Sequence, residues 1–363
     1  MKIVYISNSI IPSRNANSIH VMKMCQAFSE NGHEVVLLAP LHENNISSID
    51  LYDYYGVLES FKIEFIQYVN IPKLWSFIYA YNVYKYLKNN NFDIVFGRDL
   101  RSCFLSIYLN HKVYYESHKP YCKYNFIDKY LLKSIFKSNN FKQLIVISDA
   151  LKTMYLKDNF KKEMITVAHD GADKPKDKRR IALVTKNNKL KLGYTGHLYQ
   201  GRGIDIILSI ASLLEEMEFH IVGGNQKDIN FWQKKAKSNN VIFHGFVEPS
   251  EVYKYINSFD IMLAPYQNKV TIAGKDDSSK YMSPLKIFEY MSSQKTIILS
   301  DLNVLHEVLN NNEAVYVKYN DISEWVNAIK SLKDNDYRNK LSINAYNKFI
   351  TNFTWSKRAK NVI

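Results

Sequence analysis

The sequence predicts an α/β protein with two domains of the same construction. Short apolar segments of strand length alternate with segments of helical periodicity, an order typical of a parallel sheet with helices on both faces. A charged segment with Gly and Pro, residues 170–188, interrupts this alternation, which then starts again. A chain of 363 residues is also longer than one hydrophobic core usually supports. We therefore expect two domains facing each other across a cleft, with ligands at the carboxyl ends of the strands.

The two halves of the chain repeat the same order of strands and helices. In the first half, the helix expected at Ser18–Ser29 carries apolar residues near helical spacing and ends before Gly32. The expected strands of this half are Lys2–Ile6, Glu34–Ala39, Ile63–Gln67, Ile94–Phe96, Val113–Glu116 and Leu144–Ile147. In the second half the expected strands are Lys191–Tyr194, His220–Val222, Val241–Phe243, Ile261–Ala264 and Thr296–Leu299, and the expected helices include Ile204–Met217, Asp228–Ser238 and Ser250–Ser258.

Composition excludes several classes of protein. No run of eighteen apolar residues occurs, so no helix should span a membrane. The N-terminal MKIVYISNSIIP has a strand pattern and no small-residue cleavage site, so we interpret it as a first strand and not as a signal peptide. The three scattered cysteines do not suggest a disulfide framework or a zinc site, and they indicate a reducing, cytoplasmic compartment.

Positive charge gathers in residues 71–163, which hold sixteen Lys and Arg against seven Asp and Glu in a chain of net charge +13. The same block is rich in aromatic residues. This mixture fits contact with an anionic lipid surface, such as the inner face of the cytoplasmic membrane, or with nucleic acid. A Tyr-rich core beneath a solvated Lys face is an equal alternative. No helix-turn-helix, zinc-finger or RNA-recognition signature occurs, so we expect no nucleic-acid partner.

The most informative segment is Ser283–Leu305, which predicts a short loop, a helix, a buried strand and a second loop. The start of such a helix offers free backbone N–H groups and the positive end of its dipole to an anion. Further along, Glu289 can accept hydrogen bonds from hydroxyls such as a ribose diol. The segment therefore indicates a site for a sugar nucleotide, and the alternative is a buried helix with one satisfied glutamate.

A second indication is the glycine-rich segment Gly193–Gly203, GYTGHLYQGRG, between a strand and a helix. Glycines let the backbone approach a phosphate, and Arg202 could hold a diphosphate with two hydrogen bonds. The spacing matches neither the dinucleotide fingerprint of dehydrogenases nor a P-loop. A structural turn with a solvent-facing arginine is the alternative.

Further candidates follow strands of the predicted sheets. His118 follows Glu116 at a strand end and could contact a hydroxyl or a developing charge, although most lone histidines do no chemistry. The pair Arg98 and Asp99 could orient an acceptor or form a local ion pair. The loop at 15–18 could direct N–H groups into the cleft or only cap a helix. The strand-end backbone of 244–246 could meet a nucleobase or belong to the sheet core.

We expect no metal ion. No Cys-x-x-Cys or His-x-Glu pair occurs, and the single Asp-x-Asp, Asp334-Asn335-Asp336, lies in a polar stretch that we interpret as an exposed loop.

Taken together, these segments resemble the retaining GT-B glycosyltransferases of the large group-1 class (family 4-like), which build bacterial surface glycans. The matching segments, in the family's order, are PSRNANSIHVMKMCQAFSENGHEV, YYESH, VISDALK, VAHDGAD, GYTGHLYQGRGID, VIFHGFVEPSEVYKYINSFDIMLAPY, SPLKIFEYMSSQKTIILSDL and the closing FTWSKRAK. The resemblance implies two Rossmann-like domains. The expected boundaries are 1–172 for an acceptor-side domain, 173–345 for a nucleotide-sugar-binding domain and 346–363 for a helix that packs back toward the first domain.

The resemblance also implies roles for particular residues. Glu289 would hold the ribose, Arg202 the diphosphate leaving group and His118 the transferred sugar, and these three are the expected catalytic residues. The expected binding residues are Asn17, Ser18, Gly196, His197, Gly203, His244, Phe246, Ser283, Pro284, Leu285 and Lys286.

The chain departs from the family at three places. Tyr281 stands where the family usually has a Glu eight residues before Glu289, and His197 stands where an Arg usually follows the glycine. The family's Gly-Gly of the first loop is replaced around Asn17 and Ser18. Lys286 could supply part of the missing positive charge.

The expected function is transfer of a sugar, with retention, from a nucleotide-diphosphate sugar to a glycan or lipid-linked acceptor hydroxyl in capsule or lipopolysaccharide biosynthesis, without metal or other cofactor. Peripheral contact with an anionic membrane fits such an acceptor. The alternatives are another sugar-nucleotide enzyme of the same fold, an epimerase or phosphorylase, and a non-catalytic basic protein that binds nucleic acid or membrane.

Overall fold

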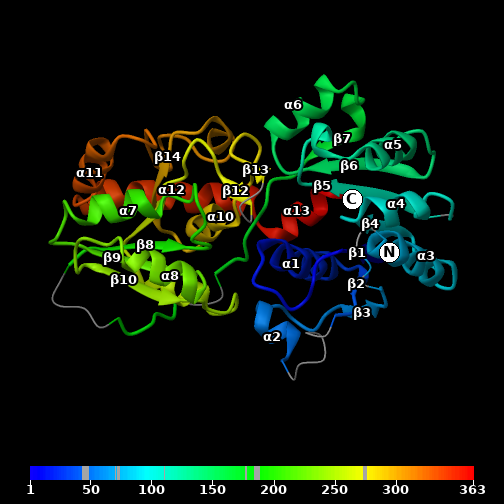
Figure 1. The fold of residues 1–363 in the computed structure, drawn as a ribbon, viewed down its shortest axis with the longest axis horizontal. Helices are drawn as coiled ribbons and strands as arrows, with labels where there is room; N and C mark the ends of the chain where they lie inside the picture. The colour runs from blue at the N-terminus through cyan, green and yellow to red at the C-terminus, as the bar shows by residue number, and fades with distance from the viewer. Residues whose placement is uncertain are drawn as a thin grey trace. The chain divides into compact units, whose positions relative to one another are not determined.

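The computed structural model describes residues 1–42, 49–69, 71, 74–109, 111–175, 178–183, 189–272 and 276–363. The chain divides into two compact units (Figure 1). Unit 1 comprises Met1–His169 and Trp355–Ile363, and unit 2 comprises Asp170–Thr354. The chain therefore passes from one unit to the other twice, after His169 and after Thr354.

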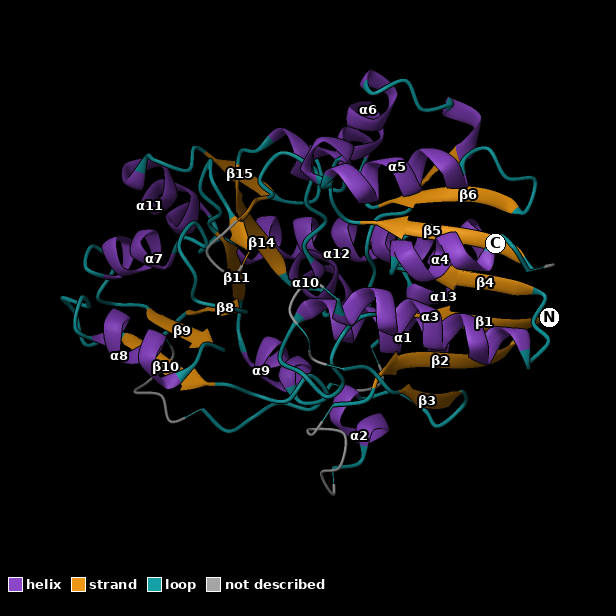
Figure 2. Cartoon of the chain, turned by 45° about the vertical axis from the view of Figure 1, so that its right-hand side comes forward, coloured by secondary structure: helices purple, strands orange, loops and turns teal. Residues whose placement is uncertain are grey.

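Unit 1 is built on a seven-stranded parallel sheet of order β3-β2-β1-β4-β5-β6-β7, whose strands lie side by side in Figure 2. The strands are β1 (Lys2–Ile6), β2 (Glu34–Pro40), β3 (Lys62–Ile66), β4 (Ile94–Gly97), β5 (Lys112–Ser117), β6 (Phe141–Val146) and β7 (Ile165–Val167). The helices are α1 (Ala16–Glu30), α2 (Leu51–Tyr55), α3 (Trp75–Lys88), α4 (Leu100–Ser106), α5 (Phe126–Ile135), α6 (Asp149–Lys157) and α13 (Trp355–Val362). Helix α13, from the far end of the chain, packs against α1.

Unit 2 repeats this plan with a six-stranded parallel sheet of order β10-β9-β8-β11-β14-β15. Its strands are β8 (Lys191–Thr195), β9 (Glu218–Val222), β10 (Val241–Gly245), β11 (Ile261–Ala264), β14 (Thr296–Ser300) and β15 (Val315–Val317), and a small antiparallel pair is formed by β12 (Thr271–Ile272) and β13 (Asp276–Asp277). Its helices are α7 (Ile204–Ala211), α8 (Gln226–Gln233), α9 (Val252–Ser258), α10 (Leu285–Ser292), α11 (Ile322–Ser331) and α12 (Asn335–Asn352). Short 3₁₀ turns occur at Tyr121–Lys123, Lys162–Met164 and Asn303–Glu307.

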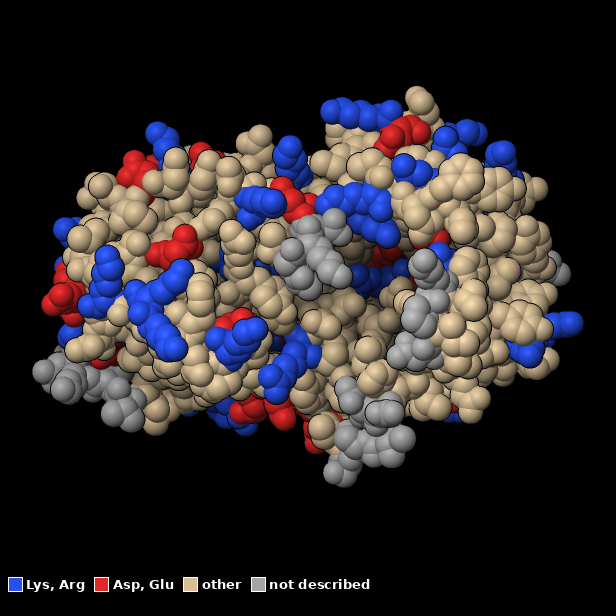
Figure 3. Space-filling model, in the orientation of Figure 1, with Lys and Arg blue, Asp and Glu red and all other residues tan. Residues whose placement is uncertain are grey.

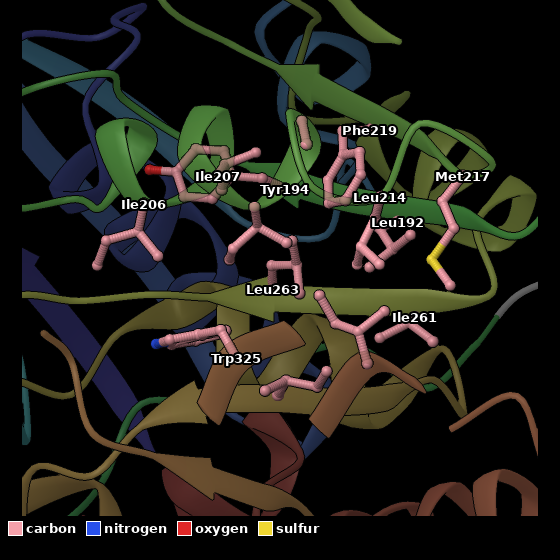
Figure 4. Packing of buried hydrophobic residues seen from close by; sticks show 14 of the residues in the cluster. Leu192, Tyr194, Ile206, Ile207, Leu214, Met217, Phe219, Ile261, Leu263 and Trp325 are labelled. Carbon is pink, nitrogen blue, oxygen red and sulfur yellow. The ribbon is translucent and has the colours of Figure 1, made fainter. Parts of the chain in front are cut away.

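The hydrophobic core of unit 2 explains why its strands are recognisable in the sequence. Leu192, Phe219 and Leu263, from three neighbouring strands, belong to one buried cluster with Ile207 of α7 and Trp325 of α11 (Figure 4). A parallel sheet covered by helices buries both faces of each strand, so its strands are nearly continuous apolar runs. The predicted α/β architecture with two parallel sheets is confirmed.

In both sheets the order in which the chain adds strands reverses at an interior strand. In unit 1 the chain moves outward from β1 to β3 and then returns to place β4 beside β1. In unit 2 it moves from β8 to β10 and returns to place β11 beside β8. Crevices at such switch points, at the carboxyl ends of the strands, are where open α/β sheets bind ligands.

Some predicted boundaries differ from the structure. The helix expected at Ile204–Met217 ends at Ala211. The reason is the side chain of Asn240, whose amide nitrogen donates hydrogen bonds of 3.0 Å to the carbonyl oxygens of Ala211, Leu214 and Met217. These bonds hold the chain in a turn in place of a further helical turn.

Two other expectations at the carboxyl end need correction. The Asp-x-Asp segment is exposed, as expected, but only Asp334 lies outside a helix. Asn335 and Asp336 begin α12, and Oδ1 of Asp334 accepts hydrogen bonds from the backbone N–H groups of Asp336 and Tyr337 and caps this helix. The expected segment boundary at residue 346 falls inside α12, and the part of the chain that joins unit 1 begins at Trp355. Of the expected linker 170–188, residues 176, 177 and 184–188 lie outside the described residues, and Asp170 and Ala172 belong to unit 2.

Candidate functional site

In unit 2 the predicted glycine-rich turn follows β8 at the switch point. Gly196 has φ +131° and Gly203, the cap of α7, has φ +79°. A Cβ atom at Gly196 would lie 3.0 Å from Nζ of Lys286, and a Cβ at Gly203 would lie 1.8 Å from the carbonyl oxygen of Pro265. Gly203 therefore needs glycine for backbone conformation and for space, and Gly196 needs it chiefly for backbone conformation.

Lys286 lies in the first turn of α10 with its side chain directed at this turn. Its ammonium group is buried, 3.6 Å from the ring centroid of Tyr194 and 5.4 Å from that of Tyr266. Nζ has no hydrogen-bond partner among the described residues. Burial and the charge of Arg202 hold the pKa of Lys286 well below its ordinary value, and Glu289 offsets this only in part.

Arg202 supplies a second cation at the same place. Its guanidinium carbon lies 5.7 Å from the ring centroid of Tyr266, and its Nε is buried without a hydrogen-bond partner in the described part of the chain. A buried donor left unpaired is costly unless a ligand accepts from it. Arg202 and Lys286 thus form a cluster, hereafter the cation pair, that is complete only with an anion.

Glu289 lies one turn after Lys286 on α10 and is partly buried. The helix is fastened at this end of the sheet because the hydroxyl of Tyr290 accepts a 2.9 Å hydrogen bond from the backbone N–H of Thr195. Ser283 and Pro284 precede α10, and Leu285 is its first residue. The hydroxyl of Ser283 accepts a hydrogen bond from the N–H of Asp170, which anchors the loop. The structure thus brings Gly196, Arg202, Lys286 and Glu289 together.

In unit 1 the carboxylate of Glu116, near the end of β5, is the centre of a second cluster. It is fully buried, and its Oε1 lies 2.5 Å from Nε2 of His118 and 2.8 Å from Nε2 of His20. Two arginines complete the cluster, with Nη1 of Arg358 at 3.2 Å and Nε of Arg98 at 3.8 Å. Burial alone would raise the pKa of Glu116, but the charges of Arg358 and His20 and the hydrogen bonds from both histidines hold it well below its usual range.

His118 is held differently. Burial and the charge of Arg98 lower the pKa of His118 to about 4, although its hydrogen bond to Glu116 acts in the opposite direction. The imidazole is therefore neutral at physiological pH.

The other predicted residues of unit 1 lie at the start of α1. The carbonyl oxygen of Asn17 accepts a 3.3 Å hydrogen bond from Arg98, which joins this loop to the Glu116 cluster. The hydroxyl of Ser18 is buried and donates to the carbonyl oxygens of Ser13 and Asn15. These hydrogen bonds of Ser18 close the first turn of α1.

Three further predicted residues of unit 2 follow β8 or lie at the end of β10. The ring of His197 stacks on Tyr199, and Phe246 follows β10. His244 lies on β10, which β9 separates from β8, and its Nε2 is 3.0 Å from Nδ1 of His220. Burial lowers the pKa of His244.

Two members of the Glu116 cluster were not predicted. His20 was inside an expected helix, where its position two residues after Ser18 was the only available signal. Arg358 contacts Glu116 across 242 positions of sequence, and no local pattern reports such a contact.

The Glu116 cluster also has the residue types of a metal site, since His20, Glu116 and His118 present ligand atoms within 4.8 Å of one another. However, Arg358 and Arg98 approach the same carboxylate. Two fixed cations beside the only anionic ligand disfavour a divalent ion there.

Comparisons with known proteins match both parts of the chain to glycosyltransferases. The family model "Glycosyltransferase Family 4" matches residues 18–174, and the model "Glycosyl transferases group 1" matches residues 189–335. An uncharacterised glycosyltransferase of Methanocaldococcus jannaschii is 24% identical, over 99% of this chain and 96% of its own length.

Two solved structures show the same fold. HepE of Anabaena, in complex with UDP and glucose, superposes with a TM-score of 0.72 at 13% identity, over 99% of this chain and 97% of its own. WaaG, a glycosyltransferase involved in lipopolysaccharide biosynthesis, superposes with a TM-score of 0.66 at 13% identity, over 99% of this chain and 98% of its own. At such identities the likeness concerns the fold.

Proposed function

Because the chain belongs to the group-1 glycosyltransferases, with the GT-B fold, we propose that it transfers a sugar from a nucleoside-diphosphate sugar to a hydroxyl group of a glycan or lipid-linked acceptor, with retention at the anomeric carbon. The observation that carries this proposal is the cation pair of Arg202 and Lys286 at the switch point of unit 2. The buried Lys286 and the half-buried Arg202 each present a buried nitrogen atom, Nζ and Nε, without a hydrogen-bond partner among the described residues, and a diphosphate matches such a pair.

The remaining residues at this end of the sheet fit the rest of the donor. Glu289 is on the same helix face as Lys286, one turn on, and its carboxylate can accept hydrogen bonds from the two hydroxyls of a ribose. The N-terminus of α10 adds backbone N–H groups to the anion site. In the proposed function His118, neutral at physiological pH, contacts the transferred sugar.

The reaction needs stabilisation of the leaving group more than it needs a nucleophilic side chain. The bond from the anomeric carbon to the diphosphate oxygen breaks, and the negative charge that develops on the diphosphate is stabilised by Arg202 and Lys286. The acceptor oxygen forms its bond on the same face, and its proton passes to the departing diphosphate. The proposed transfer uses these two cations in place of a metal ion.

Replacing Arg202 with Ala tests this proposal. We expect turnover to fall by about 100-fold or more, because a group that stabilises transition-state charge is lost, while affinity for the acceptor stays the same. Equal losses in turnover and acceptor affinity would contradict the role of Arg202. The anomeric configuration of the product, read by NMR, tests retention, and incubation of the donor without acceptor separates transfer from epimerisation.

We further propose that unit 1 contacts an anionic membrane through α3, α4 and α5. These helices pack in a row, α3 against α4 and α4 against α5. They and the turns beside them expose large apolar side chains, which we call the aromatic face: Phe77, Tyr81, Tyr108, Phe126, Ile127 and Tyr130. Figure 3 shows an area of uncharged residues over α4 and α5 with Lys and Arg side chains near its borders.

Cations accompany the aromatic rings on this face. Nζ of Lys85 lies 4.5 Å from the ring centroid of Tyr81, and Nζ of Lys129 and of Lys133 each lie 5.5 Å from that of Tyr121. Arg101, whose guanidinium lies 3.9 Å from the ring centroid of Phe77, is mostly buried and paired with Asp128. Aromatic rings at the headgroup level, flanked by Lys and Arg, are typical of peripheral attachment to anionic lipid. No helix in the described part of the chain is both long and apolar enough to cross a bilayer.

Vesicle flotation tests this surface. Vesicles with anionic lipid should bind the chain more tightly than neutral vesicles, and the variant Phe126→Ser with Tyr130→Ser should lose most of this binding. Phe231→Ser on α8, an exposed aromatic residue of unit 2, is the matched control and should bind as the unmodified chain does. Equal binding by all three proteins would exclude the aromatic face.

A further inference from the structure

We infer that Glu116 is a positioning residue, which fixes the ring of His118 with its proton on Nε2 and leaves Nδ1 as a hydrogen-bond acceptor for the transferred sugar, and that Arg358 of the last helix holds Glu116 in place. This inference rests on the proposed function, in which His118 contacts the sugar. The inference adds Glu116 and Arg358, which contact neither the donor nor the acceptor.

The first support is that the two carboxylate oxygens of Glu116 have different partners. Oε1 faces Nε2 of His118 at 2.5 Å and Nε2 of His20 at 2.8 Å, whereas Oε2 faces Nη1 of Arg358 at 3.2 Å. The side chain of Glu116 is fully buried, so bulk water does not compete for either oxygen. Because the carboxylate can only accept, the nitrogen of His118 that faces it is the one that carries a proton.

The second support is the way the loop around His118 is fastened. The hydroxyl of Tyr155 donates to Oγ of Ser117 at 2.9 Å and lies 3.0 Å from the carbonyl oxygen of Lys119. Tyr124 adds a 2.7 Å hydrogen bond to the same serine. The residues on both sides of His118 are thus held by buried tyrosines, and Glu116 is left to set the orientation of the ring.

The third support is the geometry of Arg358. Besides Glu116, its guanidinium donates to the carbonyl oxygens of His169 at 2.9 Å and Ala168 at 3.2 Å. These residues precede the point where the chain leaves unit 1. One planar group therefore ties the Glu116 carboxylate to α13 and to this exit, which the single ammonium of a lysine cannot do.

The chemical consequence concerns the direction of a hydrogen bond. With Nε2–H given to Glu116, Nδ1 keeps its lone pair and accepts from a sugar hydroxyl. The low pKa of His118, about 4, agrees with a ring that stays neutral in this role. The opposite tautomer would present a donor, and two donors facing each other would lose the contact.

The primary experiment is a nitrogen NMR spectrum of the full chain labelled at histidine, in which a His118→Gln variant identifies the signals of His118. We expect the unmodified protein to carry the proton of His118 on Nε2. Glu116→Gln should give a mixture of tautomers, because an amide can donate as well as accept, and kcat should fall about 10- to 100-fold. The affinity for a nucleoside diphosphate should change less than about twofold, because unit 2 binds it.

Arg358→Lys tests the second residue and also serves if Glu116→Gln does not fold. We expect it to shift the tautomer signals and lower kcat by about tenfold, whereas Lys360→Gln, an exposed residue of the same helix, should change neither. A proton on Nδ1 in the unmodified protein, or unchanged tautomer and kcat in Arg358→Lys, would overturn the inference while leaving sugar transfer intact. Failure of the proposed function itself would appear as absence of transfer and of diphosphate binding in the unmodified protein.

Discussion

The two units share a sheet plan but differ in how they treat charge at the switch point. In unit 1 the buried carboxylate of Glu116 is surrounded by two histidines and two arginines from this same unit. In unit 2 the nitrogen atoms of the cation pair, Nζ of Lys286 and Nε of Arg202, are buried without an acceptor in the described residues. The Glu116 cluster is thus neutralised by contacts within the folded chain, whereas the cation pair requires a bound anion. Folding therefore stabilises the Glu116 cluster, and ligand binding stabilises the cation pair.

The sharpest way to break this comparison is to remove the central carboxylate of unit 1. Glu116→Ala should lower the free energy of unfolding by about 3–5 kcal/mol, because Arg98 and Arg358 lose the anion that compensates them in a buried site. Denaturant unfolding followed by circular dichroism measures it. Glu34→Ala, at an exposed glutamate of the same sheet, is the control and should cost no more than about 1 kcal/mol. Similar losses in both variants would show that the cluster does not stabilise unit 1.

The corresponding change in unit 2 should have the opposite effect on stability. Lys286→Met removes a buried amino group without a hydrogen-bond partner among the described residues, so the free energy of unfolding should stay the same or rise by about 1 kcal/mol. Affinity for a nucleoside diphosphate, measured by calorimetry, should fall at least about 30-fold, or ~2 kcal/mol. Lys280→Met, at an exposed lysine nearby in the chain, should change neither quantity. A large loss of stability in Lys286→Met would mean that the fold already satisfies this cation.

A third test separates backbone strain from crowding at the anion site. Gly196→Ala forces an alanine to φ +131° and places Cβ 3.0 Å from Nζ of Lys286, whereas Gly32→Ala meets nothing within 4 Å at φ +84°. Both should destabilise the protein, by about 1–3 kcal/mol, but only Gly196→Ala should weaken diphosphate binding. Weakened binding in Gly32→Ala, or unchanged binding in Gly196→Ala, would argue against a site at the Gly196 turn.

The sequence predicted those parts of the molecule that depend on local patterns. Strands such as Glu34–Pro40 are continuous apolar runs because both faces of the sheet are covered, so their positions were predicted to within one or two residues. The three-residue strands β7 and β15 were not predicted because such short runs carry no period. Arg202 was found because it lies in a glycine-rich segment after a strand, and Glu289 because it is the one carboxylate in a mostly apolar helix.

What the sequence could not predict are contacts made across the fold. Whether Lys286 has an acceptor, and whether Glu116 is already neutralised, depends on side chains that arrive from other elements. Arg358 contacts Glu116 from the last helix, and the ring of Tyr194 lies beneath the Nζ of Lys286. The distinction between a satisfied and an unsatisfied cluster is therefore a tertiary property. It is also the property that separates a structural charge from a binding one.

The smallest expected effect is the uptake of a proton by Lys286 when a diphosphate binds to unit 2. Burial and Arg202 depress the pKa of Lys286, so the free enzyme holds this amine neutral above that lowered pKa. A bound diphosphate favours the ammonium, so binding takes up as much as one proton, and affinity falls as pH rises, by up to about tenfold per pH unit. Calorimetry in buffers of different ionisation enthalpy measures this proton uptake. The pH should lie well above the second phosphate pKa of about 6, so that the ligand itself does not change protonation. Lys286→Met should bind without proton uptake, and an uptake that persists in this variant would assign the proton to another group.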